Sequence, residues 1–130
     1  MFLTTGAIVA LSGCSALNTA SAQIARIRLE NDDSSAHEFS LTIRVNGEIV
    51  YDETHLITAE ENDSSIELTD EIPDERGNIT IEITVEGTEI TESATFDDDN
   101  CYDVIGEYTG DNLIIWQSGS DDGCDTFTAE

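Results

Sequence analysis

The sequence predicts an all-β fold, an antiparallel β-sandwich of about seven or eight strands. Apolar and polar residues alternate with a period of two in successive segments, and turn residues separate these segments at intervals of roughly ten residues. No segment shows a convincing helical period. The chain has 130 residues, a length that suits one core rather than two.

The first two strands are predicted over residues 24–30 and 38–45. In the first, one face comprises Ala25, Ile27 and Leu29. In the second, which has the clearest alternation, the inner face comprises Phe39, Leu41, Ile43 and Val45. Residues 31–35, an Asn, Asp and Ser run, separate the two strands.

A tight turn follows the second strand. Asn46-Gly47 favours a type I′ turn, which should pair Val45 with Glu48 and Ile43 with Val50. We expect the returning strand to leave the sheet near Asp52, where its inner face becomes polar.

The middle of the chain contains three further strands. Residues 52–65 are mostly polar and should cross between sheets. Alternation resumes over 66–72, and residues 73–78 form a loop. A central strand is predicted over 79–85, and a tight turn at Glu86-Gly87 returns the chain into 88–96.

The last hairpin joins residues 101–108 to 112–117. Its turn, Thr109-Gly110-Asp111, should pair Tyr108 with Leu113, Gly106 with Ile115 and Ile105 with Trp116. One face of this hairpin can join the core. The other face is also apolar, and its exposed positions would be Ile105, Ile114 and Trp116.

The strand number and spacing over residues 24 to about 117 resemble those of immunoglobulin-like and fibronectin type III domains. That resemblance implies two packed antiparallel sheets. The chain departs from antibody domains in one respect, because Trp116 lies on the last strand rather than on an early one.

The N-terminal segment predicts export. Residues 2–11 are uncharged and largely apolar, with the length of the hydrophobic part of a signal peptide. Leu11-Ser12-Gly13-Cys14 resembles the lipobox of secreted lipoproteins, which implies cleavage before Cys14 and attachment of lipid to its sulfur. The alternative is a buried helix or strand of a cytosolic domain. Three parts are therefore expected: a signal peptide at 1–13, a flexible tether at 14–23 and the sandwich domain at 24–130.

The charge balance is strongly acidic. The chain has 29 Asp and Glu against four Lys and Arg, and a net charge of −25. Such a chain repels itself at low ionic strength, whereas about 1 M salt shortens the Debye length to about 3 Å. The composition resembles that of haloarchaeal proteins. It excludes nucleic acid as a partner, because phosphate binding requires a basic surface.

Two cysteines remain after Cys14. In an exported domain we expect Cys101 and Cys124 to form a disulfide, and the hairpin register places Cys101 opposite about Ser120. A redox or metal-binding pair is the alternative, without CxxC spacing to support it. The disulfide would bring the tail with Phe127 near Trp116 as a cover. Otherwise Ile105, Ile114 and Trp116 form an exposed patch that binds a partner.

Further candidate sites are weaker. Asp97, Asp98, Asp99 and Asn100 could supply oxygen ligands for Ca²⁺, although a solvated acidic loop explains them as well and the run does not fit an EF-hand. Asn62 and Asn78 begin N-glycosylation sequons.

The sequence thus predicts a non-enzymatic protein, since hydrolase motifs such as G-x-S-x-G are absent and no cofactor site is indicated. We expect a binding or structural module that is lipid-anchored on the outer face of the cytoplasmic membrane, with an envelope protein as its partner. The alternative is a Ca²⁺-stabilised or small-solute-binding accessory lipoprotein of an uptake system.

Overall fold

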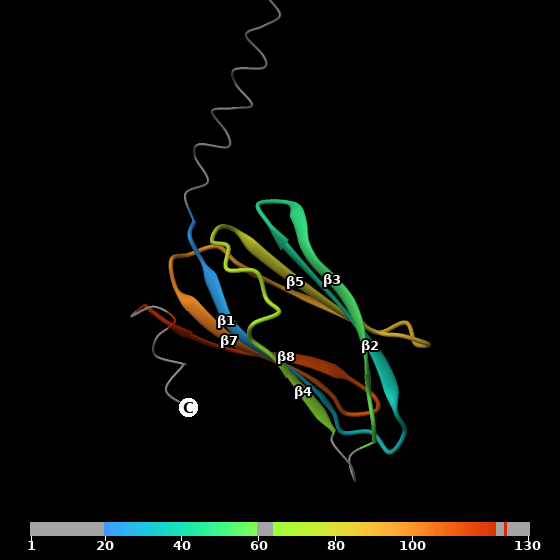
Figure 1. The fold of residues 1–130 in the computed structure, drawn as a ribbon. Helices are drawn as coiled ribbons and strands as arrows, with labels where there is room; N and C mark the ends of the chain where they lie inside the picture. Colours follow the sequence, from blue (N-terminus) through green and yellow to red (C-terminus); the bar gives the residue numbers. More distant parts are fainter. Residues whose placement is uncertain (1–19, 60–63, 122–123, 125–130) are drawn as a thin grey trace, which may run out of the picture.

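The computed structural model describes residues 20–59, 64–121 and 124, which form a nearly all-β sandwich of two four-stranded sheets (Figure 1). The predicted fold class is therefore confirmed. The eight strands are β1 (Gln23–Asn31), β2 (His37–Val45), β3 (Glu48–Ile57), β4 (Ser65–Leu68), β5 (Ile79–Val85), β6 (Thr91–Phe96), β7 (Cys101–Tyr108) and β8 (Leu113–Ser120). No helix among these residues is long and apolar enough to cross a membrane.

The strand order is β4-β1-β7-β8 in one sheet and β3-β2-β5-β6 in the other. β1 and β7 run parallel, and the other pairings between named strands are antiparallel. In an immunoglobulin constant domain the first two strands share a sheet. Here β1 and β2 lie in different sheets. The likeness to immunoglobulin domains therefore concerns the two-layer architecture and not the strand order.

The core lies between the two sheets and follows the period-two alternation. In β2 the predicted inner face is confirmed, because Phe39, Leu41, Ile43 and Val45 are all buried. Alternate residues of β5 from Ile79 to Val85 are buried in the same way. Gly106 of β7 allows close packing of the sheets, since a Cβ atom there would lie 2.6 Å from Ile83 Cδ1.

Two β-bulges change the predicted registers. Val45 pairs with Glu48 as expected, and the turn contains positive φ angles at Asn46 (53°) and Gly47 (89°). Ile43 pairs with Tyr51 rather than Val50, because the register shifts between Ile43 and Arg44.

In β1 a second register shift lies between Ile24 and Arg26. Ile24 is consequently buried in the core, where the sequence predicted Ala25.

β3 is longer than predicted. It continues past Asp52 to Ile57, and its residues 52–54 are exposed. The polar inner positions do not end the strand because β3 is an edge strand, where they reach solvent beside the core.

The last hairpin has the predicted register, with Tyr108 opposite Leu113 and Ile105 opposite Trp116. Cys101 lies opposite Ser120, and Cys101 and Cys124 form the expected disulfide, with 5.1 Å between their Cα atoms. The disulfide ties the end of the described chain to the start of β7.

Removing this disulfide should lower the free energy of unfolding by about 3 kcal/mol, because the cross-link spans 23 residues and restricts the unfolded chain. The measurement is denaturant unfolding in high salt of a Cys101→Ala, Cys124→Ala double variant. Reduced wild-type protein should match the variant. Equal stability of the oxidised wild type and the double variant would contradict this expectation.

Candidate functional site

The predicted apolar patch lies on the outer face of the sheet that contains β7 and β8. We call Ile105, Ile114 and Trp116 the outer patch. Trp116 is directly opposite Ile105, and Ile114 is opposite Glu107. Trp116 is 54% exposed and Ile114 is 38% exposed. Phe127, the residue expected to cover them, lies outside the described residues.

A carboxylate fixes the orientation of Trp116. The indole Nε1–H donates a hydrogen bond to Glu107 Oε1 at 3.0 Å. A hydrogen bond with the Asp32 side chain, followed by the bond from Trp116, holds the pKa of Glu107 below its usual range. Glu107 is therefore ionised near neutral pH and accepts the indole proton donor. The side chain of Trp116 is held in place although more than half of it remains exposed.

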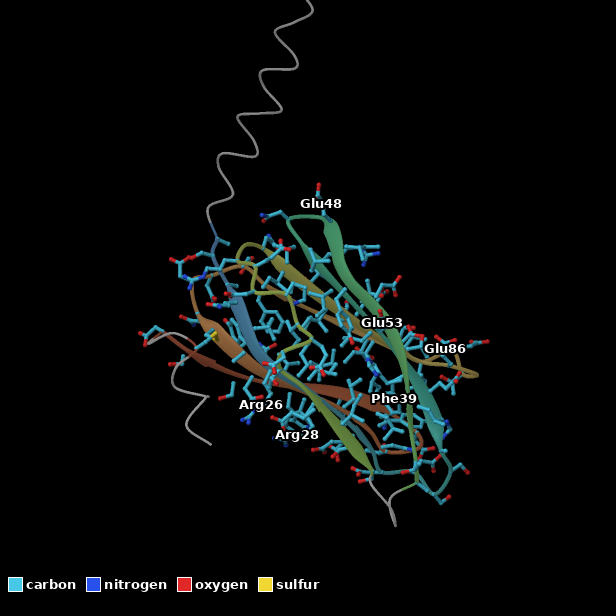
Figure 2. All side chains as sticks on the ribbon, in the orientation of Figure 1. Arg26, Arg28, Phe39, Glu48, Glu53 and Glu86 are labelled. Atoms are coloured by element: carbon cyan, nitrogen blue, oxygen red, sulfur yellow. A yellow bond between two sulfur atoms is a disulfide. The ribbon has the colours of Figure 1, made fainter. Side chains whose placement is uncertain are left out.

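Two of the four arginines, Arg26 and Arg28, lie on the same side of the sheet as the outer patch (Figure 2). Arg26 binds Asp103 through both carboxylate oxygens, with Nε–Oδ1 and Nη2–Oδ2 distances of 3.1 and 2.8 Å. The two side chains are only 13% and 15% exposed. Arg28 pairs with Glu30, with 3.4 Å between Nη1 and Oε2. Arginine and acid alternate beside the outer patch, so local charges partly neutralise one another.

A group of carboxylates at one end of this face was not predicted. Oxygens of Glu30, Asp32 and Glu107 lie within 4.8 Å of one another. They meet because β1 runs parallel to β7, with Glu30 opposite Glu107, and this pairing leaves no signal in the sequence. Arg28 pairs with Glu30, and this cation reduces the repulsion within the group.

The acidic run Asp97–Asn100 serves the chain's own hydrogen bonds. Asp98 accepts the Tyr102 O–H at 2.6 Å and the Asn100 N–H at 3.1 Å, and both bonds lower its pKa. Asp99 accepts both the N–H and the hydroxyl of Ser21. The three-carboxylate group found within residues 20–59, 64–121 and 124 includes none of these four residues.

Of the three predicted modification sites, Cys14, Asn62 and Asn78, the structure describes Asn78. Cys14 and Asn62 lie outside the described residues. Asn78 lies just before β5, and its N–H donates to the Asn46 side-chain oxygen at 3.0 Å. Its side chain is half-buried.

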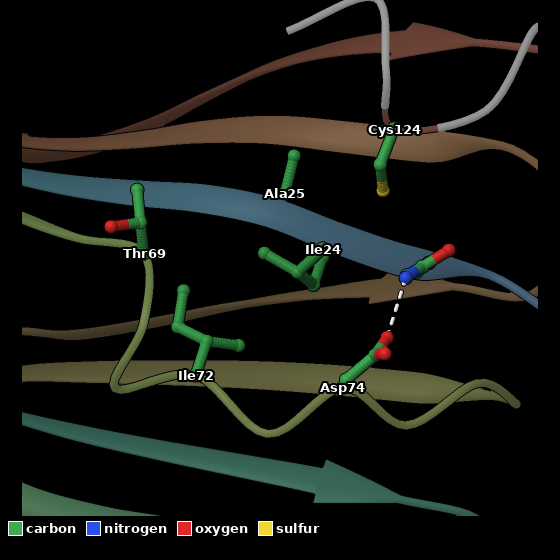
Figure 3. A pocket seen from close by; sticks show the side chains of 7 residues that line it. Ile24, Ala25, Thr69, Ile72, Asp74 and Cys124 are labelled. Carbon is green, nitrogen blue, oxygen red and sulfur yellow. Dashed lines mark hydrogen bonds between the residues drawn. The ribbon is translucent and has the colours of Figure 1, made fainter. Parts of the chain in front are cut away.

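A shallow depression of about 230 Å³ lies beside the disulfide (Figure 3). Its floor includes Ile24 and Ile72, and a hydrogen bond of 2.7 Å from Gln23 Nε2 to Asp74 Oδ1 crosses it. The depression is open to solvent, and its one ionisable lining side chain among the described residues is Asp74. Among the described residues of its lining, Asp74 therefore has no second ionisable side chain beside it for acid–base chemistry.

No protein-family model matches the chain, and the comparison with curated proteins gave no match either.

Proposed function

We propose that this protein is a non-enzymatic, lipid-anchored recognition module of the cell envelope, and that its outer patch binds a protein partner. The observation that carries the proposal is Trp116, which is 54% exposed on an open sheet face and oriented by Glu107. Tryptophan is enriched among the residues that contribute most to binding at protein interfaces. A fixed aromatic side chain also loses little conformational freedom when a partner binds it.

The net charge supports an apolar mode of recognition. At −25 the chain repels acidic partners in dilute salt, and concentrated salt screens attraction and repulsion alike. Burial of apolar surface retains its strength under both conditions. The outer patch contains no charged residue, and ion pairs flank it. It is thus suited to binding a partner in concentrated salt.

The start of the domain is compatible with an anchor at Cys14. Ser21 is bonded to Asp99, and Ala22 forms a two-way backbone bridge with Gly77. Only the short stretch from Cys14 to Ala20 precedes the first of these bonds. Fully extended, this stretch spans at most about 25 Å. A lipid on Cys14 would therefore keep the sandwich close to the membrane surface.

Replacing Trp116 by Ala should reduce capture of the partner by about 30-fold or more, because truncating an aromatic residue that acts as a hot spot costs about 2 kcal/mol or more of binding free energy. The measurement is quantitative pull-down from native membranes in high salt with the full-length lipidated protein. Leu56→Ala is the matched control, because Leu56 is 64% exposed but lies on β3 of the other sheet. Equal capture by Trp116→Ala and wild type contradicts the proposal.

A further inference from the structure

The open edge of β8 differs from the other sheet edges. Strands β3, β4, β6 and β8 end the two sheets. Acidic residues interrupt three of them: Glu48, Asp52 and Glu53 in β3, Glu67 in β4 and Glu92 in β6. The eight residues of β8, Leu-Ile-Ile-Trp-Gln-Ser-Gly-Ser, include no charge and no proline. Charge, proline and short length are the usual features that prevent edge strands from pairing with another chain.

The direction of the backbone groups of β8 follows from two hydrogen bonds. The Tyr108 carbonyl accepts the N–H of Asp32 at 2.8 Å, so Tyr108 directs its backbone toward β1. The N–H of Thr109 donates to Asn112 at 2.9 Å. Bonded pairs alternate along an antiparallel ladder, so Ile114 and Trp116 bond to β7. Leu113, Ile115 and Gln117 direct their N–H and C=O groups to the open edge.

We infer that β8 pairs antiparallel with β8 of a second copy of this chain, so that a continuous eight-stranded sheet crosses the dimer. An uncharged incoming strand avoids placing carboxylates beside the apolar residues of β8, and β8 itself is the one edge strand among those described that lacks charge. Antiparallel pairing of identical strands also generates the two-fold symmetry that closes a dimer.

The pairing would join the two outer faces side by side. The register with the fullest overlap of outward-directed groups places Trp116 opposite Trp116 of the second copy, at the two-fold axis. Two copies that each carry −25 repel one another in dilute salt, so the dimer should form in concentrated salt. This dimer is separate from the proposed partner binding, because it is held by backbone hydrogen bonds along the edge of β8 and not by the side chains of the outer patch.

The test uses a protein of residues 14–130 with Cys14→Ser, which contains every described residue. Two variants of it are compared, Gln117→Pro and Ser93→Pro. Gln117 is exposed and its N–H is directed to the open edge of β8. Ser93 is the matched control on edge strand β6. It is exposed, and because Val85 N–H donates to the Ile90 carbonyl, Ser93 also directs its N–H away from its neighbouring strand. Proline is tolerated at such positions.

In concentrated salt, light scattering should give the mass of two chains for wild type and Ser93→Pro. Gln117→Pro should have the mass of one chain, with a dissociation constant raised about 100-fold or more. Any other pattern overturns the inference, including a single-chain mass for wild type.

If Gln117→Pro does not fold, hydrogen exchange of wild type decides: the amides of Ile115 and Gln117 should gain protection as the protein concentration rises. Concentration-independent exchange overturns it. Gln117→Pro retains all side chains of the outer patch, so partner capture is tested separately.

Discussion

Replacing Asn31 by Asp should lower the free energy of unfolding by about 4 kcal/mol. Asn31, at the end of β1, is the buried polar residue of the described core, with no exposed side-chain surface. Its Nδ2 donates to the carbonyls of Ser35, Ile57 and Thr58 at 2.9, 3.1 and 3.0 Å, and its Oδ1 accepts the Asp33 N–H. The side chain thus joins β1, the loop after it and the end of β3.

A carboxylate of the same shape has no donor and would face the same three carbonyl oxygens. Asn31→Ala is the control, because it removes the bonds without adding charge and should cost about 2 kcal/mol. The measurement is denaturant unfolding in high salt near neutral pH. Burial raises the pKa of an unpaired Asp, so the penalty should shrink as the pH falls. An Asp variant as stable as the Ala variant would refute this account.

The sequence allowed the strands and inner faces to be predicted because burial in a sandwich imposes a period of two. β2 and β5 show this period clearly, because one face of each strand is buried along its length and the other face is not. The register of the last hairpin could also be predicted from its turn, and that register placed Ile105 opposite Trp116. The outer patch was thus derivable from local pattern alone.

Features that depend on distant strands could not be predicted. The bulge in β1 lies in its parallel pairing with β7, which joins residues more than seventy positions apart. The bulge in β3 lies within a hairpin, but its turn residues Asn46-Gly47 gave no sign of it. Asn31 resembled an ordinary loop residue, because the carbonyls of Ile57 and Thr58 lie 26 and 27 residues away. The meeting of Glu30 with Glu107 depends on the same parallel pairing.

Transfer from concentrated salt to about 0.1 M salt should unfold the domain cooperatively, because the Debye length rises from about 3 Å at 1 M to about 10 Å. The chain has a net charge of −25 and few compensating cations: among the described residues, Arg26, Arg28 and Arg44 form ion pairs with carboxylates. Far-ultraviolet circular dichroism is the suitable measurement. Fluorescence of the single tryptophan is less suitable, since Trp116 is already 54% exposed in the folded domain.

The charge origin of this unfolding can be separated from general salt effects by neutralising exposed carboxylates. Glu48→Gln, Glu53→Gln and Glu89→Gln together change the net charge from −25 to −22, and all three residues are exposed (Figure 2 labels Glu48 and Glu53). Because repulsion grows roughly with the square of the charge, the triple variant should unfold at a lower salt concentration than wild type. Leu56→Ala, which alters an exposed residue without changing charge, should leave the midpoint unchanged. If native circular dichroism persists at about 0.1 M salt, or if the triple variant and wild type share one midpoint, then self-repulsion does not limit the stability of this fold.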